Sequence, residues 1–309
     1  MSAHLSNLRQ IDPVLTQLAQ GYRQADLVAE RIMPQVYVDK EGIKVPLYGK
    51  GSVLTYETER APHADSNVMQ VDKATTMPVV LDEHDLAASV DYREQAESMF
   101  DEKSKATRRV TQGVQLGQEI ETAALIQKPS VYAAGLKTDL AGTDQWNEDG
   151  SDPVEAAQVA KAEVRKACGQ EPNILVLGAA VYDRLLIHPA LKAYLSGSER
   201  KILTVEILRN LFGVEEIIVG KAVHAASLGG PVGDVWGKFA SLLVRPSIVS
   251  TGNDEGIQSF GYTFRRRGQP VVDTYVGVGG KLEYCRYTDI RKPAVVGGTC
   301  GYLFNKAIA

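Results

Sequence analysis

The densest group of side chains that could hold a metal ion is the run Asp82-Glu83-His84-Asp85. A metal site needs ligands that converge, but neighbouring residues of a β-strand point to opposite faces. A solvated strand end is therefore favoured over a metal site, and no metal ligand is predicted. His63, His188 and His224 lack a partner at a zinc-ligand spacing, and His188 before Pro189 is typical of a helix terminus.

Catalytic and phosphate-binding motifs are not recognisable in the sequence. The run Gly277-Val278-Gly279-Gly280-Lys281 lacks P-loop spacing and precedes no helical pattern, so a tight turn between strands is predicted. Ser196-Gly197-Ser198 lies in a polar stretch typical of a turn. A strand-to-helix junction, where α/β enzymes often carry their chemistry, reads Gly178-Ala179-Ala180 and offers neither nucleophile nor phosphate loop. We predict no catalytic residue and no cofactor, and a role in binding or construction rather than an enzyme.

Positive charge is concentrated at two places in a chain with a formal net charge of -4. Binding to a polyanion would need such a local basic face, since net charge gives no support for it. Lys103, Lys105, Arg108 and Arg109 form one group, which either faces a polyanion or is a solvated helix face. The triplet Arg265-Arg266-Arg267 before Gly268 is predicted to cap a hairpin.

Composition is that of a globular protein: 309 residues, 44% hydrophobic and 23% charged. No apolar run is long enough to span a bilayer, and the N-terminus lacks the features of a signal peptide. The three cysteines, Cys168, Cys285 and Cys300, form no Cys-x-x-Cys pair, which favours a reducing environment and inert thiols.

Five segments follow one another along the chain. Residues 1–35 are predicted to form an arm with a short helical face at Leu15, Leu18, Ala19 and Tyr22. Residues 36–90 are rich in β-formers and turns, with strands expected at Val68–Val71 and Met77–Leu81. The spacing over 94–127 predicts one long helix of about 50 Å. Helices and strands then alternate until about residue 250, with Asp152 as a cap before Pro153, and β-type alternation returns over 256–304.

This order of parts resembles the major capsid proteins of tailed bacteriophages, which have the Hong Kong 97-type fold. Three groups of phrases carry the resemblance: Ala25–Pro34 followed by Val36-Tyr37-Val38; Asp144-Gln145-Trp146, Asp152-Pro153, Pro172–Gly178 and Leu185–Pro189; and Phe260–Phe264 with Gly301-Tyr302-Leu303. Their order is more specific than any one of them, and together they cover nearly the whole chain.

The resemblance implies an α+β fold with an N-terminal arm (1–35), an extended β-loop (36–90), a peripheral domain with a spine helix (91–150), an axial α/β domain (151–250) and closing peripheral strands (251–309). It implies hexamers and pentamers in an icosahedral virion capsid around double-stranded DNA, assembled in the host cytoplasm. Lys103, Lys105, Arg108 and Arg109 would then face DNA. Lys50, Tyr56 and Arg60 would lie in the loop between subunits.

Expected partners are further copies of the chain, packaged DNA, a portal, decoration proteins and, because few residues precede the loop strands, a separate scaffolding protein; no membrane partner is expected. The Lys, Asn and Glu set that crosslinks some members cannot be mapped onto this sequence. An encapsulin-type compartment with the same fold is the first alternative. An α/β hydrolase or nucleotide-dependent enzyme is the second, but it would need a nucleophile or phosphate loop after Leu177.

Overall fold

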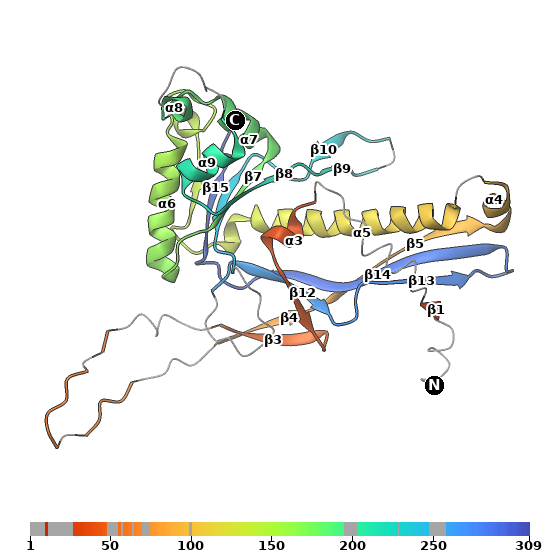
Figure 1. The fold of residues 1–309 in the computed structure, drawn as a ribbon, viewed down its shortest axis with the longest axis horizontal. Helices are drawn as coiled ribbons and strands as arrows, with labels where there is room; N and C mark the ends of the chain where they lie inside the picture. Colours follow the sequence, from red (N-terminus) through yellow and green to blue (C-terminus); the bar gives the residue numbers. More distant parts are fainter. Residues whose placement is uncertain are drawn as a thin grey trace.

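The computed structural model describes residues 10–11, 27–47, 55–56, 58–63, 65–69, 75–98, 101–194, 203–227, 229–246 and 258–309. Figure 1 shows a lobe of helices and strands at one end of the long helix α5, with long strands running beside that helix. In the described part of the chain the helices are α3 (Ala29–Ile32), α4 (Tyr92–Glu97), α5 (Glu102–Ile126), α6 (Pro153–Cys168), α7 (Ala179–Ile187), α8 (Pro189–Ala193) and α9 (Val205–Phe212), with 3-10 turns η2 (Pro129–Val131) and η3 (Gly142–Asp144).

Long strands form the sheet beside α5, in the order β1-β13-β14-β12-β2, with β5 paired along β14. Their bounds are β1 (Gln10–Ile11), β2 (Gln35–Val38), β5 (Asp82–Asp91), β12 (Gly261–Arg266), β13 (Val271–Val276) and β14 (Leu282–Val295). Helix α5 packs across β14 and β5. The Gly277–Lys281 segment is the tight turn between β13 and β14 that the sequence predicts, with positive φ angles at Gly279 and Gly280.

The lobe contains a five-stranded sheet in the order β6-β15-β11-β7-β8. Its strands are β6 (Lys137–Asp139), β7 (Ile174–Gly178), β8 (Glu216–Gly220), β11 (Ala240–Leu243) and β15 (Gly301–Asn305). All of β7 is buried, and it lies between antiparallel β11 and parallel β8. The sheet therefore includes β6 and β15, which lie outside the predicted 151–250 segment.

Local sequence signals account for the helix ends of the lobe. Asp152 accepts hydrogen bonds from the backbone N–H groups of Val154 and Glu155, which confirms the predicted cap of α6. The helix ends where Gly169 adopts the left-handed conformation at φ 81°. His188 ends α7 and caps α8 through its Nδ1, as its position before proline predicts.

The predicted single helix over 94–127 is wrong in its extent. The chain leaves helical conformation at Ser98, and α5 starts after Asp101, whose side chain caps it by accepting from Lys103 N. A helix of 25 residues is about 37 Å long. The predicted apolar face holds for Val110 and Val114, but Ile120 and Ala124 are exposed. Half of the buried residues of α5 are polar, namely Thr107, Thr111, Gln118, Glu119 and Thr122.

A separate hairpin, β3 (Gly42–Leu47) with β4 (Thr75–Val80), projects from the sheet. Its base packs in a small apolar cluster that includes Val79, Leu81, Phe264 and Ile290. Residues 58–63 and 65–69, between the two strands, lie away from both the sheet and the lobe (Figure 1). Val68 and Met69 are not in a strand, so that part of the predicted strand Val68–Val71 is wrong; the arm face from Leu15 to Tyr22 lies outside the described residues.

A smaller hairpin, β9 (Val223–Ala225) with β10 (Val232–Asp234), extends from the lobe. No helix in the described part of the chain is long and apolar enough to cross a membrane.

Candidate interaction surfaces

The strand-to-helix junction at Gly178 serves close packing. A Cβ atom at this position would lie 1.9 Å from the backbone oxygen of Gly237 and 3.1 Å from that of Trp236. Only glycine therefore lets β7 and the segment before β11 approach this closely. The nearby residue Gln127 at the end of α5 donates to Val235 O and accepts from Gly237 N. The junction fixes the lobe against the spine helix.

Glu119 on α5 is a buried carboxylate that joins three parts of the chain. It accepts from the backbone N–H groups of Val28 (3.0 Å) and Ala29 (2.8 Å) at the start of α3, and from the indole N–H of Trp236 (2.7 Å). Burial raises the pKa of Glu119, while these hydrogen bonds act in the opposite direction. One side chain thus fixes the arm-side helix, the spine and the lobe relative to one another.

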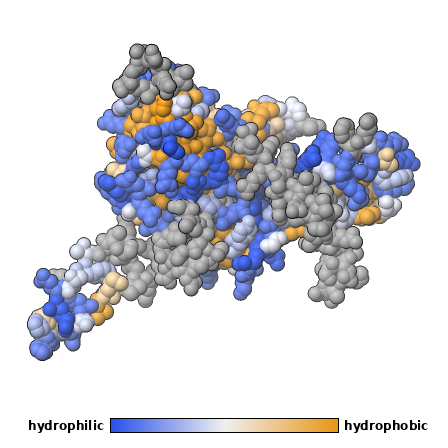
Figure 2. All heavy atoms as spheres, viewed as in Figure 1, coloured by the Kyte–Doolittle hydropathy of each residue, from blue (hydrophilic) through white to orange (hydrophobic). Residues whose placement is uncertain are grey.

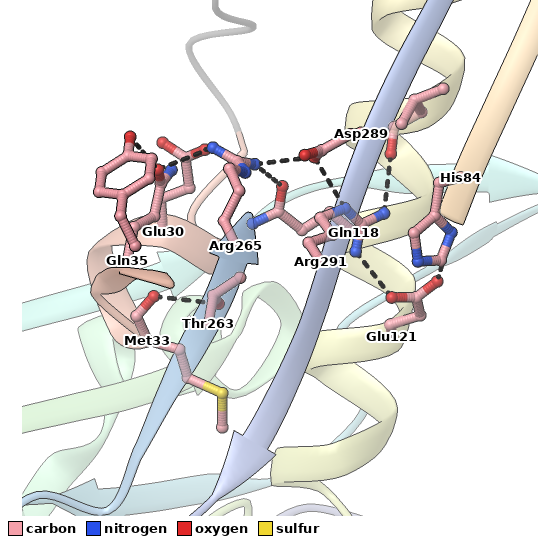
Figure 3. A network of polar contacts seen from close by, with 12 residues as sticks. Glu30, Met33, Gln35, His84, Gln118, Glu121, Thr263, Arg265, Asp289 and Arg291 are labelled. Carbon is pink, nitrogen blue, oxygen red and sulfur yellow. Dashed lines mark hydrogen bonds and ion pairs between the residues drawn. The ribbon is translucent and has the colours of Figure 1, made fainter. Parts of the chain in front are cut away.

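A second polar network lies between α5 and the long sheet, shown in Figure 3. Arg265 on β12 and Arg291 on β14 are 5% and 1% exposed, and both contact Asp289 Oδ2, at 2.9 and 3.1 Å. Burial alone would lower the pKa of Arg265, but Asp289 and Glu30 hold that pKa above its ordinary value. Two buried cations therefore share one buried anion.

Carboxylates at the rim complete the charge balance of this network. Arg291 Nη1 donates to Glu121 at 2.7 Å, and Glu121 also pairs with His84 Nδ1 at 3.5 Å. Arg265 Nη1 donates to Gln35 at 2.7 Å and lies 3.6 Å from Glu30. The network thereby links β2 and the arm-side helix to β5 through the spine (Figure 3).

The prediction that the arginine triplet caps a hairpin is wrong. Strands β12 and β13 do not form a hairpin, because β14 lies between them in the sheet and pairs with both. Arg265 is buried in the network, whereas Arg266 pairs with Glu41 at 2.7 Å and Arg267 with Asp39 at 2.8 Å. The last two arginines hold the turn between β2 and β3, from which the projecting hairpin starts.

The predicted basic group on the spine divides into two kinds of residue. Lys103 forms an ion pair with Glu283 at 2.7 Å, which raises the pKa of the lysine, and Lys105 pairs with Glu102 at 3.2 Å. Arg108 and Arg109 are exposed, and within the described residues neither has an ion pair. Lys105, Arg108 and Arg109 share one helical face by their spacing, but Lys103 is directed to the sheet.

The three predicted loop residues are only partly described. Lys50 lies outside the described residues, Tyr56 is half-buried and Arg60 is exposed. The projecting loop and the start of α5 lie on opposite sides of the molecule (Figure 1). Beyond them, Val68 and Met69 are 88% and 57% exposed, and neither joins an apolar cluster among the described residues.

Apolar side chains also gather on the surface of the lobe, as Figure 2 shows. The large exposed ones on and beside α7, α8 and α9 are Ile187, Tyr194 and Val205. At the opposite end of the molecule, Val278 is fully exposed in the turn between β13 and β14.

Three side chains of the histidine- and acid-rich run of β5 already have polar partners within the chain. Asp82 pairs with Lys292, His84 with Glu121, and Asp85 accepts from Thr288 at 3.2 Å. No group of three His, Cys, Asp or Glu side chains that could hold a metal is found where the structure describes the chain. Ser196 and Ser198 fall outside that part.

Sequence reasoning missed Glu119, Trp236 and the pair Arg265–Asp289. Their partners are more than twenty residues away in sequence, so no local spacing marks them. One signal was available: Glu119 and Gln118 stand on what becomes the buried face of a long helix, where unpaired polar side chains are costly.

Residues 8–227 match the family model described as phage major capsid protein E. The major capsid protein of Burkholderia phage BcepMu is 41% identical over 304 residues, covering 97% of this chain and 98% of that protein. A crystal structure of a phage-related protein from Bordetella bronchiseptica superposes with a TM-score of 0.78 at 29% identity, over 97% of this chain and 98% of that one. The capsid of the cyanophage P-SCSP1u shares the fold, with a TM-score of 0.60 at 9% identity over 92% of this chain and 89% of that one.

Proposed function

The chain belongs to the phage major capsid protein E family, and we propose from this premise which of its surfaces bind neighbouring copies and which face packaged DNA. It is a shell-forming structural protein of the virion capsid with the Hong Kong 97-type α+β fold. This family is a family of structural proteins, not of enzymes.

Copies of the chain contact one another through the projecting loop. The supporting observation is that Val68 and Met69 expose their apolar side chains on a segment that projects from the packed β3–β4 base. Burial of such side chains by a neighbour contributes roughly 1.5–3 kcal/mol each. Tyr56, Arg60 and Lys50 belong to the same loop, and we assign them to this contact.

Assembly of the double variant Val68→Asp, Met69→Asp tests the loop contact. We expect a folded, soluble subunit that forms shells much less efficiently, measured by light scattering after size-exclusion chromatography and by negative-stain microscopy. Asp65→Asn, an exposed polar change in the same loop, is the matched control and should assemble normally. Normal shells from the double variant would refute the assignment, which leaves membership of the family untouched.

The subunits form hexamers and pentamers of an icosahedral shell that encloses double-stranded DNA. Arg108 and Arg109 are the strongest candidates for DNA contact, because they are exposed and lack ion pairs within the described residues, whereas Lys103 and Lys105 already have carboxylate partners. Their contacts are with phosphates and are therefore independent of base sequence and sensitive to salt.

Charge removal separates DNA contact from subunit contact. In Arg108→Gln, Arg109→Gln, empty shells should form normally while DNA retention falls and its dependence on salt weakens. Lys103→Gln is the matched control, since this lysine is paired with Glu283 and should affect stability rather than DNA retention. Failure of the double variant to form empty shells would place Arg108 and Arg109 in a subunit interface.

We assign residues 1–35 to the arm, 36–90 to the extended loop, 91–150 and 251–309 to the peripheral domain and 151–250 to the axial domain, whose sheet β6 and β15 complete. Assembly takes place in the host cytoplasm, with a portal, a separate scaffolding protein and decoration proteins as further partners. Co-expression with candidate scaffold genes, scored by particle uniformity, tests this partner set.

The sequence left an encapsulin-type compartment as an alternative on the same fold, but the family model and the 41% identical relative favour the phage capsid. The contents of particles purified from infected cells distinguish the two: nuclease-protected DNA supports the capsid, and a single cargo enzyme without DNA supports the compartment.

A further inference from the structure

The β9–β10 hairpin is a surface element without charge. Residues 222–233 contain no Asp, Glu, Lys or Arg, in a chain of which 23% is charged. Two other charge-free stretches of similar length, 173–182 and 294–305, contain no exposed residue. In 222–233, by contrast, most of the described residues are exposed, and the hairpin projects from the lobe (Figure 1). Depletion of charge on a projecting element is typical of the centre of a protein–protein interface.

One face of this hairpin is apolar and open to solvent. Val232 lies directly opposite Ala225 in the antiparallel register, and Val223 is two residues from Ala225 on the same strand, so the three side chains share a face. Val223 and Val232 are 51% and 66% exposed. A hairpin with strands of three residues gains little stability by itself, so this face is one that a partner can stabilise by covering it.

The base of the hairpin is held firmly against the spine. Val235 N donates to Ala222 O at 2.9 Å and closes the hairpin. Directly after it, the Trp236 indole donates to Glu119, and the Gln127 amide donates to Val235 O. A partner therefore meets a surface that is already ordered, which lowers the entropic cost of binding.

The outer face of α5 is a surface of the same character. Ile120 is 37% exposed, Ala124 is exposed, and Leu86 of the adjacent β5 is 43% exposed. A Cβ atom at Gly113 would lie 2.7 Å from Leu86 Cδ2, so this leucine lies against the helix. Together these residues form an apolar surface on one side of the spine.

This part of α5 also lacks free charge. Between residues 110 and 127 the charged residues are Glu119 and Glu121. Glu119 is buried, and Glu121 pairs with Arg291 and His84. An uncharged hairpin can therefore cover this face without leaving a charge unpaired.

The apolar surface of the lobe fits the hairpin less well. There, exposed Glu206 and Arg209 stand on α9 with Val205. The hairpin has no charged partner for these two side chains, and covering them without one costs desolvation free energy.

The hairpin and the outer face of α5 also match in length. A strand of three residues is about 10 Å long. The stretch of α5 from Leu116 to Ala124 rises by about 12 Å. Within one subunit the two surfaces do not cover each other, because Val223, Val232 and Ile120 all remain exposed. The match is therefore available between copies.

We propose that the β9–β10 hairpin packs its apolar face on the outer face of α5 in a second copy of this chain. The family builds shells from copies of one protein, so every hairpin has a neighbour's spine available. The contact joins two different surfaces, and head-to-tail contacts of this kind generate rings when the rotation closes. It is separate from the contact of the projecting loop and does not depend on it.

Two single-cysteine variants, Val232→Cys and Ile120→Cys, test the contact. Both sites are exposed, and the three native cysteines are buried. Shells co-assembled from equal amounts of the two variants are treated with a short bis-maleimide and analysed on denaturing gels and by peptide mapping. We expect a dimer that links the peptide around position 232 of one chain to the peptide around position 120 of another. Co-assembly of Val232→Cys with Val159→Cys, an exposed site on α6, is the matched control and should give no dimer.

Three results would overturn the proposal. The first is the absence of the dimer from co-assembled shells. The second is a dimer in shells of Val232→Cys alone, which would mean that hairpins meet each other. The third is a chain with both substitutions that crosslinks only within itself, which would mean that the hairpin covers its own spine.

Hydroxyl-radical footprinting of the wild type gives an answer even where the cysteine variants do not assemble. Val223, Val232, Ile120 and Leu86 should lose reactivity when free subunits form shells, while Val159 keeps its own. Unchanged reactivity of the hairpin pair or of the spine pair in closed shells would contradict the contact.

Discussion

At the scale of single residues, Glu119 is the side chain on which most long-range contacts converge. Its carboxylate accepts hydrogen bonds from two backbone N–H groups at the start of α3 and from the indole N–H of Trp236. Glu119→Gln supplies an amide donor where three donors already point, so we expect a loss of about 1–3 kcal/mol of stability at pH 7. Denaturant unfolding monitored by tryptophan fluorescence measures it; an unchanged midpoint would contradict the role.

The raised pKa of Glu119 also predicts how this difference varies with pH. The folded state binds a proton at a higher pH than the unfolded state, whose ordinary value is 4.5. The pH-dependent part of this group's contribution to stability is therefore fully present below pH 4.5 and is lost as pH rises through the folded-state pKa, whereas the hydrogen bonds to the carboxylate remain. Relative to Glu119→Gln, the wild type should gain stability as the pH falls from 7 toward 4.5, whereas a constant difference would mean that burial does not shift this carboxyl.

Gly178 is predicted to tolerate no side chain. A Cβ there would meet the backbone oxygen of Gly237 at 1.9 Å, and a backbone atom cannot move aside as a flexible side chain can. We expect Gly178→Ala to destabilise the subunit by about 3 kcal/mol through overpacking. Gly150→Ala is the matched control, because a Cβ at Gly150 meets nothing within 4 Å. Equal melting temperatures for the two variants would show that the backbone around Gly178 and Gly237 shifts to accommodate the added Cβ atom.

At the scale of elements, β7 is the strand on which the lobe depends. Leu175 and Val176 are 0% exposed on opposite faces of a strand with neighbours on both sides. Truncation of either side chain to alanine should cost roughly 2–4 kcal/mol and lower the soluble yield. Val159→Ala on α6, at 58% exposure, should cost little. Losses near zero at both β7 sites would place this strand outside the cooperative core.

Elements with local signals were predictable from the sequence, and elements defined by distant partners were not. Asp152, Gly169 and the apolar run of β7 mark their own structure because caps and buried strands depend on near neighbours. The sequence predicts a spine that is too long and an apolar face that includes Ile120, which is exposed. The neighbouring buried positions carry Gln118 and Glu119, whose partners Arg265 and Trp236 are distant in sequence. The basic group on the spine was recognisable, but the pairing of Lys103 with Glu283 depends on a fold that brings β14 beside α5.

At the scale of the whole molecule, one chain carries several separated exposed surfaces. The projecting hairpin, the apolar surface of the lobe and the exposed turn at Val278 lie in different parts of an elongated subunit (Figures 1 and 2). Each copy in a closed shell can therefore engage several others at once, and multiple contacts on one subunit reinforce one another through high effective concentration. A shell held in this way needs no covalent bond between subunits.

We accordingly expect mature particles to be held together by non-covalent contacts alone. The sequence offers no recognisable Lys, Asn and Glu set for an isopeptide crosslink, and the three free cysteines, Cys168, Cys285 and Cys300, are all buried within the subunit. Boiled and reduced particles should run on a denaturing gel as one band near the 33.6 kDa mass of the monomer. A ladder of covalent oligomers would contradict the prediction. Lys50→Arg particles then identify the source, because a ladder lost in that variant assigns the crosslink to the loop lysine, and a ladder retained assigns it elsewhere.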